Sequence, residues 1–255
     1  DVAITGDVVL FATAASAAAP SGGEALPGLI NLNIDSGGLQ ATGDLSVSGD
    51  ASTLADGASA TGTDIAITLS NGSNASFTRA DLFNEAEATA TGTAIGGNVT
   101  IQTLASLDPS TFTTVQAFLG SSATGGASNT AGSFDVLAVD GTIQTTEFDF
   151  RALGDDPAPF ASRFVADTGN ILVTGNGYAE VTGDVLVQYA NDGTILAGSA
   201  PDNLSGFFEI YADGTIDIVG DSTAERSFAA LFMDLSAREI DVDPLANFGG
   251  PFVTL

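Results

Sequence analysis

The stretch that decides the fold reads Phe208-Glu209-Ile210-Tyr211-Ala212-Asp213-Gly214-Thr215-Ile216-Asp217-Ile218. Apolar and polar residues alternate on both sides of its central Asp-Gly pair. Alternation with a period of two places the apolar side chains on one face of a β-strand. The Asp-Gly pair supplies a turn, because Asp can hydrogen-bond its own backbone and Gly accepts a positive φ. The stretch therefore predicts two strands joined by a tight bend.

The same strand–bend–strand pattern recurs along the chain. Bends rich in Asp, Asn and Gly precede Ile143, Ile171 and Ile195, as one precedes Ile216. Successive members of this series lie roughly 20–30 residues apart, a period typical of solenoids. We therefore expect an all-β fold in which residues 1–255 form a single elongated parallel β-solenoid. The alternative is an antiparallel β-sandwich, because an Asp-Gly bend between alternating strands also predicts a hairpin.

Three segments break the alternation. Residues 108–120 begin with Asp108 and Pro109 and end with a glycine, which predicts a short helix. Residues 222–235 begin with a capping box and predict a second helix, although a strand is an equal alternative there. Residues 76–90 fit either element. A low-complexity Gly/Ser-rich segment at 120–131 predicts a loop, so we expect an excursion from the solenoid near 105–131. We expect the chain to be a fragment of a longer protein.

The sixteen phenylalanines are expected in the interior, stacked between successive turns of the solenoid. Most of them lie in alternating apolar strands, where burial of each ring contributes roughly 1.5–3 kcal/mol. The alternative is a stripe of surface rings that binds sugars.

Charge and composition exclude several classes of function. The chain has five Arg, no Lys and 32 acidic residues, for a net charge of −27. Such a surface repels phosphate backbones and anionic lipids, so we expect no nucleic-acid partner. Cysteine and histidine are absent, which excludes disulfides, thiolate zinc sites and histidine-based catalytic triads. No apolar run is long enough for a transmembrane helix.

Acidic residues at the bends suggest calcium. Asp35, Asp140, Asp167, Asp192 and Asp213 all lie at bends of the repeating pattern. In a solenoid, equivalent bends stack about 5 Å apart, and carboxylates and turn carbonyls are ligands that calcium prefers. We therefore take Asp140, Asp167, Asp192 and Asp213 as candidate calcium ligands, with solvated turns as the alternative. No other cofactor is expected.

An enzymatic function has little support in the sequence. Two carboxylates can hydrolyse glycosides without other groups, and Asp155-Asp156 is an adjacent acidic pair. The pair precedes Pro157 and Pro159, a context typical of an exposed turn. We therefore expect a non-catalytic protein.

Several short phrases resemble the repeats of large bacterial exoproteins, namely filamentous-haemagglutinin-like, two-partner-secretion and autotransporter passenger proteins. The phrases are Gly43-Asp44-Leu45-Ser46-Val47, Gly97-Asn98-Val99-Thr100-Ile101 and Thr168-Gly169-Asn170-Ile171-Leu172-Val173. The resemblance implies a right-handed parallel β-helix with an adhesive or structural role at the cell surface, and it implies no catalytic residue. The chain departs from the family pattern in its long, irregular repeats and its lack of lysine.

These observations predict an extracellular or cell-surface structural or adhesive protein of a bacterium, such as a filament or matrix subunit. Its expected partners are further copies of itself, other surface proteins or glycans. One alternative is a calcium-dependent surface-layer or matrix protein built on a β-sandwich. A second alternative is a carbohydrate-active β-helix enzyme.

Overall fold

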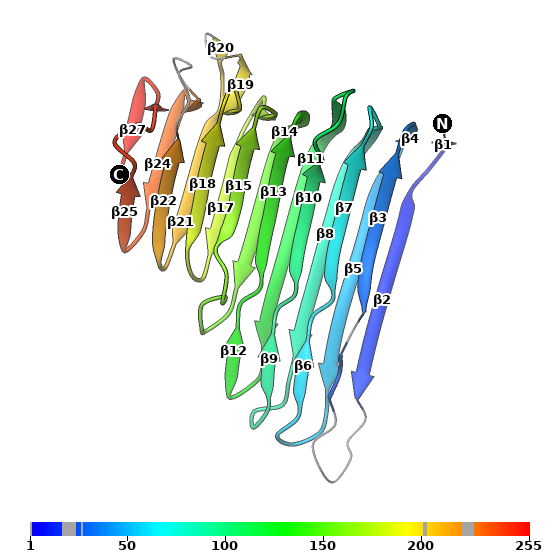
Figure 1. The fold of residues 1–255 in the computed structure, drawn as a ribbon. Helices are drawn as coiled ribbons and strands as arrows, with labels where there is room; N and C mark the ends of the chain where they lie inside the picture. Colours follow the sequence, from blue (N-terminus) through cyan, green and yellow to red (C-terminus); the bar gives the residue numbers. More distant parts are fainter. Residues whose placement is uncertain (1, 17–23, 27, 201–202, 221–226) are drawn as a thin grey trace.

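The computed structural model describes residues 2–16, 24–26, 28–200, 203–220 and 227–255. Across these residues the chain forms strands and no α-helix. The strands lie side by side in a column, with β1 at one end and β25 and β27 at the other (Figure 1). Accordingly, the described part of the chain contains no helix able to cross a membrane.

Neighbouring strands in the column are parallel. Each strand pairs with its counterpart one turn earlier and one turn later, as β7 (Asp64–Ser70) does with β3 (Leu29–Asp35) and β10 (Asn98–Thr103). Among the pairings of named strands in the described chain, the short pair β19–β20 is antiparallel. This pairing establishes the parallel β-solenoid and rules out the antiparallel sandwich.

One face of the column is an eight-stranded sheet. Its strands are β3, β7, β10, β13 (Ser133–Val139), β15 (Ser162–Asp167), β18 (Val185–Ala190), β22 (Thr215–Gly220) and β25 (Glu239–Val242).

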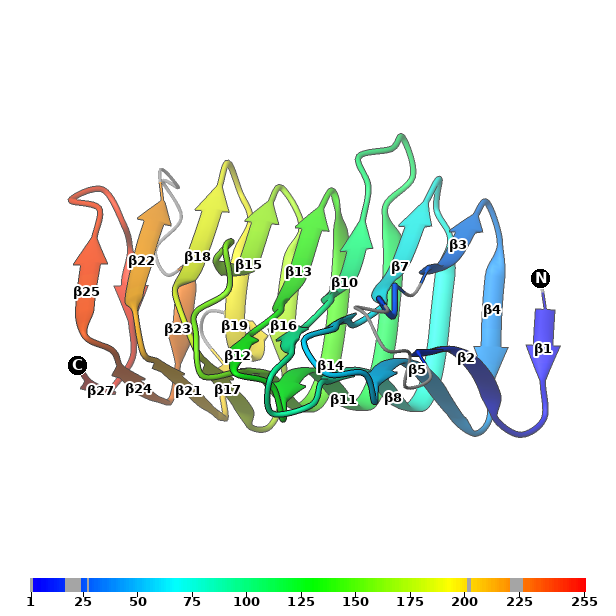
Figure 2. The same cartoon turned by 90° about the horizontal axis from the view of Figure 1, so that it is seen from below.

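The opposite side is a sixteen-stranded sheet, folded lengthwise into two halves. The first half-sheet consists of β1 (Val2–Ile4), β4 (Gly38–Ala41), the first parts of β8 (Asn74–Glu87), β11 (Ser110–Thr124) and β14 (Gly141–Leu153), then β16 (Asn170–Val173), β19 (Thr194–Ala200), β23 (Phe228–Ala230) and β26 (Phe248–Gly249), with β20 (Asn203–Leu204) beside β19. The second half-sheet consists of β2 (Val8–Ser16), β5 (Asp44–Thr53), the later parts of β8, β11 and β14, then β17 (Gly177–Val181), β21 (Phe207–Ala212), β24 (Phe232–Ser236) and β27 (Phe252–Thr254). Figure 2 shows the second half-sheet along one side of the column and the eight-stranded sheet along the other.

A bend inside β8, β11 and β14 separates the two half-sheets. At the bend, two consecutive residues face outward, Val115 and Gln116 in β11 and Thr146 and Glu147 in β14. Alternation then resumes in the opposite phase, so that buried positions on the two sides of the bend are three residues apart. The bend thus turns the chain around the core without breaking the strand.

This bend explains why the predicted helix at 108–120 is wrong. Phe112 and Leu119 both point inward from β11, but the phase change between them gives an odd, helix-like spacing. Residues 76–87 likewise belong to β8. In the second predicted helix, residues 222–226 lie outside the described residues, and from Phe228 onward the chain forms β23 and β24.

The expected loop excursion near 105–131 is much smaller in the structure. Residues 104–109 form the loop, and β11 then begins at Ser110. Residues 128–130 form β12 (Ser128–Thr130), which joins β9 (Thr93–Ile95) and β6 (Ser59–Thr61) in a three-stranded sheet. Behind this sheet lies a thin core in which every described apolar residue is an alanine, including Ala60, Ala86 and Ala94. The abundant alanine of the sequence therefore fills a space too narrow for larger side chains.

The isoleucine series is confirmed in part. Ile143, Ile171 and Ile195 lie side by side in the first half-sheet. The next member of that row is Phe228. Ile216 instead pairs with Val185 in the eight-stranded sheet. The bend before Ile216 is therefore at a different corner of the coil from the bends before the other three.

Continuous apolar rows form the main core. One row follows the register of the eight-stranded sheet from Leu32 to Val242 through Ile67, Ile101, Val136, Phe164, Val187 and Ile218. Among the side chains that the structure describes, eight phenylalanines are buried in the interior, as predicted: Phe77, Phe112, Phe134, Phe148, Phe150, Phe164, Phe208 and Phe228. Phe148 and Phe150 stack with their ring centroids 4.3 Å apart.

Candidate functional site

The candidate calcium ligands do not all share one corner of the solenoid. Asp140, Asp167 and Asp192 lie at turns that lead from the eight-stranded sheet into the first half-sheet. Asp213 lies between β21 and β22, at the corner where the chain leaves the second half-sheet. The expected stacking of all four residues is therefore wrong for Asp213.

Hydrogen bonds to neighbouring turns already occupy several of these carboxylates. The side-chain amide of Asn191 donates to Oδ1 of Asp167 at 2.6 Å. At the same corner near the β3 end of the column, Asp35 accepts hydrogen bonds from the Asn71 side chain at 2.6 Å and from the Ser70 hydroxyl at 3.0 Å. These bonds hold the pKa of Asp35 below its ordinary value. Within the described residues, no three acidic side chains come close enough to form a metal-binding group. Calcium binding at these corners stays a prediction.

Asp155 and Asp156 hold a turn together. Asn129 donates its side-chain amide to Asp155 at 2.5 Å, and Ser128 donates its hydroxyl to Asp156 at 2.8 Å. Their backbone amides both donate to the carbonyl of Asn129. The pair thus attaches its loop to β12, and both residues are exposed, as expected for a turn.

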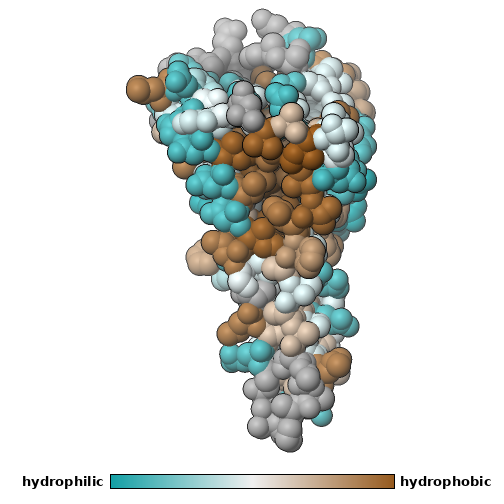
Figure 3. Space-filling view, turned by 90° about the vertical axis from the view of Figure 1, so that its right-hand side faces the viewer, coloured by the Kyte–Doolittle hydropathy of each residue, from teal (hydrophilic) through white to brown (hydrophobic). Residues whose placement is uncertain are grey.

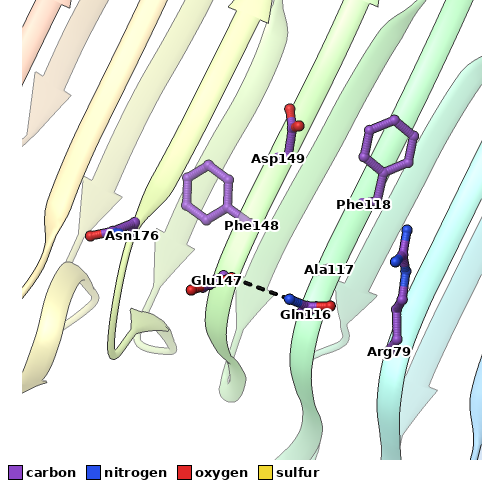
Figure 4. Close-up of a pocket in the computed structure, with 8 residues that line it drawn as sticks. All are labelled: Arg79, Gln116, Ala117, Phe118, Glu147, Phe148, Asp149 and Asn176. Atoms are coloured by element: carbon purple, nitrogen blue, oxygen red, sulfur yellow. Dashed lines mark hydrogen bonds between the residues drawn. The ribbon is translucent and has the colours of Figure 1, made fainter.

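The outer face of the second half-sheet carries a denser set of functional groups. At the bend, Arg79, Gln116, Glu147 and Asn176 lie in a row across neighbouring strands, as Figure 4 shows. They line a hollow of about 340 Å³ together with Phe118 and Asp149. Gln116 donates to Glu147 at 3.3 Å, and Arg79 donates to Asp81 at 2.7 Å. The hollow therefore offers both hydrogen-bond donors and acceptors.

A second cluster surrounds Arg151 on the same face. Its guanidinium binds both carboxylate oxygens of Asp149 at 2.8 and 3.0 Å and lies 4.0 Å from Glu180. It also lies 5.4 Å from the centre of the Tyr178 ring, within the range of a cation–π contact. The Tyr178 hydroxyl donates to Glu180 at 3.0 Å, and partial burial raises the Tyr178 pKa. These contacts fix the orientation of the Tyr178 ring.

Three phenylalanines form a stack on this outer face. Phe207, Phe232 and Phe252 occupy successive strands, with ring centroids 4.7 Å apart at both steps and rings within 11° of parallel. Phe207 and Phe252 are 42% and 57% exposed. The expectation that the phenylalanines fill the interior is wrong for these three.

The sequence contains a signal for this stack that the prediction missed. Each of the three rings directly precedes an apolar residue of the inward phase. Phe208 and Met233 are buried, and Val253 continues their row at the end of the column. Alternation therefore assigns the rings to the outward phase.

The ends of the column form a further candidate site. At the β1–β4 end, the inward residues are only partly buried and pack against the core: Ile4, Val8, Leu10, Ile30, Leu32, Ile34 and Leu39. In the view onto this end, they form an apolar patch between polar margins (Figure 3). At the other end, Ile240 and Val242 of β25 are partly buried in the same way.

The two ends carry matching rows. Leu32 and Val242 are the outermost members of one apolar row. The residues that directly precede the members of this apolar row form a second row on the outer surface of the sheet. This outer row begins at Asn31 and ends at Asp241. A second coil stacked on β3 in the same register would place Asp241 beside an amide rather than another carboxylate.

No protein-family model, curated protein or solved structure matches the chain.

Proposed function

We propose that this protein is a structural or adhesive component of a bacterial cell surface and that its columns join end to end into filaments or a matrix. The observation that carries the proposal is the parallel column itself, in which each coil covers the apolar row of its neighbour, as a further coil would cover the patch around Leu32. Exposed strand edges are templates for pairing with another chain. Another coil stacked there would bury the patch and continue the hydrogen-bonded ladder.

The matching rows support a second copy as the partner. Val242 of one copy would follow Leu32 of the next, and Asp241 would follow Asn31. Solenoids are stabilised by the contacts between neighbouring repeats, so a coil added at an end contributes the same kind of energy as an internal coil. The extracellular setting is supported by the resemblance of the repeated phrases to those of bacterial exoproteins.

Association can be measured by light scattering over a range of protein concentrations, with electron microscopy of the products. Because each copy carries a charge of −27, association should strengthen as salt is raised from about 0.05 to 0.5 M. Leu32→Lys and Val242→Lys each place a charge in one end surface and should abolish assembly. Asn33→Lys, on the outward face of β3, is the matched control and should leave it intact.

A monomer at every concentration and salt level would contradict end-to-end joining. Filaments that form equally well in Leu32→Lys would show that the ends are not the contact. Circular dichroism of each variant establishes that the column is folded.

A further inference from the structure

The stack of surface phenylalanines has an open position next to Phe207. The register aligns Gly177 with Phe208, so the preceding residues, Asn176 and Phe207, lie side by side one coil apart. Phe232 covers one face of the Phe207 ring at 4.7 Å. The opposite face points toward the coil of Asn176, whose side chain is exposed and much smaller than a ring. The row therefore has room for one more flat group.

A cavity occupies this position. Its volume is about 320 Å³, and its lining comprises Asn176, Gly177, Tyr178, Phe207 and Glu209. Small-molecule sites typically measure about 300–1,000 Å³ and combine apolar surface with a few polar groups. Here the polar groups are an amide, which donates and accepts hydrogen bonds, and a carboxylate, which accepts them. A ligand with a flat hydrocarbon face and hydroxyl groups around its edge fits this set.

The cavity is part of a longer groove. It shares Asn176 with the hollow at the bend, and it shares Phe207 and Glu209 with another hollow bordered by Phe232 and Phe252. The three hollows follow the column axis across β8, β11, β14, β17, β21, β24 and β27. With strands about 4.8 Å apart, six spacings give a length of roughly 29 Å. A groove of this length suits a linear polymer better than a single small molecule.

The negative charge around the groove favours an uncharged polymer. The groove is bordered by Glu147, Asp149, Glu209 and Asp234, and the chain as a whole is strongly acidic. Like charge disfavours nucleotides, uronate polymers and sulfated glycans. It also disfavours face-to-face contact with a second copy of the chain, because the same carboxylates would meet across the contact. An uncharged, hydroxyl-rich chain avoids this repulsion.

We propose that the groove on the outer face of the second half-sheet binds a linear, uncharged polysaccharide, with one sugar ring stacked on Phe207 in the open position above Asn176. The apolar face of a pyranose lies against the aromatic ring. Its hydroxyls bond to Asn176 and Glu209. Further sugar units extend along the groove in both directions.

Affinity electrophoresis tests the proposal. The protein migrates through native gels that contain hydroxyethyl cellulose, mixed-linkage β-glucan, xyloglucan or galactomannan, and through gels with the polyanion alginate. We expect retardation by at least one of the four neutral polymers and none by alginate. Lack of retardation in all four neutral gels would overturn the proposal, and so would retardation by alginate.

Two variants locate the site. Asn176→Phe completes the ring stack and blocks the open position while leaving the Phe207–Phe232 stack in place. Phe207→Ala removes the aromatic ring on which the sugar would stack. Each should weaken binding at least about tenfold, while Phe160→Ala, which removes an exposed ring outside the groove, should leave binding unchanged.

If Phe207→Ala disturbs the fold, Asn176→Phe still tests the site. The added ring in this variant should maintain or raise the melting temperature of the protein. Undiminished binding by a folded Asn176→Phe variant would contradict the assigned position. The binding measurement does not depend on end-to-end joining, since Leu32→Lys should bind the polysaccharide as the unmodified chain does.

Discussion

Arg163 on β15 lies directly beside Asp135 on β13, and its Nε and Nη2 atoms donate to the two carboxylate oxygens at 2.7 Å each. The bond to Asp135 raises the pKa of Arg163 above its ordinary value. This paired geometry ties two successive coils together on the outer face of the eight-stranded sheet. Bidentate arginine–carboxylate pairs are among the stronger charged contacts at protein surfaces.

We therefore predict that Arg163→Met lowers the free energy of unfolding by about 1 kcal/mol. Arg79→Met is the matched control, because Arg79 contacts Asp81 of its own strand through a single 2.7 Å bond. Its loss should cost less than about 0.5 kcal/mol. Urea denaturation measures both values. Equal losses would show that linking two coils gives the Arg163 pair no advantage.

The turn at Thr168 is expected to be strained. Within the described ranges, five corners of the column hold a non-glycine residue with positive φ: Ser36, Asn71, Asp140, Thr168 and Asn191. Asn and Asp tolerate this left-handed conformation, but the β-branched Thr168, at φ 60°, does so poorly.

Thr168→Asn should therefore stabilise the protein by roughly 0.5–1 kcal/mol. The reverse change at the next corner, Asn191→Thr, should destabilise it, with the added loss of the Asn191 bond to Asp167. Thermal unfolding compares the two variants. If Thr168→Asn gives no gain, the hydroxyl bond from Thr168 to the Asp167 carbonyl offsets the strain.

Asp217 and Asp241 lie side by side on β22 and β25. Partial burial is the largest cause that raises the pKa of Asp217, followed by the negative charge of Asp241. A raised pKa means that the ionised form is disfavoured in the folded protein. Wild-type stability should accordingly increase as pH falls through the folded-state pKa of Asp217 toward its ordinary value near 3.8.

At neutral pH, Asp217→Asn should stabilise the protein by about 0.5–1 kcal/mol, with a smaller gain at high salt. A double-mutant cycle with Asp241→Asn provides the control. Since each change removes the same repulsion, the combined gain should be smaller than the sum. Additive gains would show that the two carboxylates do not interact.

Tyr189 links stability to alkaline pH. Its ring is buried against Gly220, where a Cβ atom would lie within 2.4 Å of ring carbons, and burial raises the Tyr189 pKa to about 12. A phenol with a raised pKa contributes stability below its unfolded value near 10, and that contribution is lost as pH rises toward 12.

Tyr189→Phe should therefore shift the alkaline unfolding midpoint upward. Circular dichroism follows unfolding, and tyrosinate absorbance follows ionisation in the same samples. An unchanged midpoint would assign alkaline unfolding to other groups. Gly220→Ala should destabilise the protein at every pH, because the added methyl group meets the Tyr189 ring.

Alternation and bend chemistry predicted the solenoid because both act locally. The row Ile143–Ile171–Ile195 could be found from spacing alone, since each isoleucine follows a bend at the same corner. Ile216 could not be placed in this way. Its Asp-Gly bend has the same local chemistry as the others, although it turns the chain at another corner, and only strand pairing distinguishes the two.

The bent strands and the surface rings were harder to predict. In β11, the outward pair Val115–Gln116 reverses the alternation, so the pattern imitates a helix flanked by Pro109 and Gly120. The outward rings were mistaken for core because hydrophobicity does not specify phase. The groove depends on the register between coils of unequal length, and the sequence does not state that register.

Calcium at the corners gives the last prediction. A site with a Kd tenfold below the calcium concentration would add about 1.4 kcal/mol. For a chain of this size, each kcal/mol of added stability raises the melting temperature by roughly 2–4 °C.

Because Asn191 already donates to Asp167, and because Asp213 lies at another corner, we expect a smaller rise in the melting temperature when EDTA is replaced by millimolar calcium. Asp140→Asn and Asp192→Asn should leave that small response unaltered. A rise of several degrees that Asp140→Asn abolishes would instead establish a calcium site at this corner and favour the calcium-dependent matrix function. Magnesium in place of calcium is the control, since its strict octahedral geometry fits irregular turns poorly.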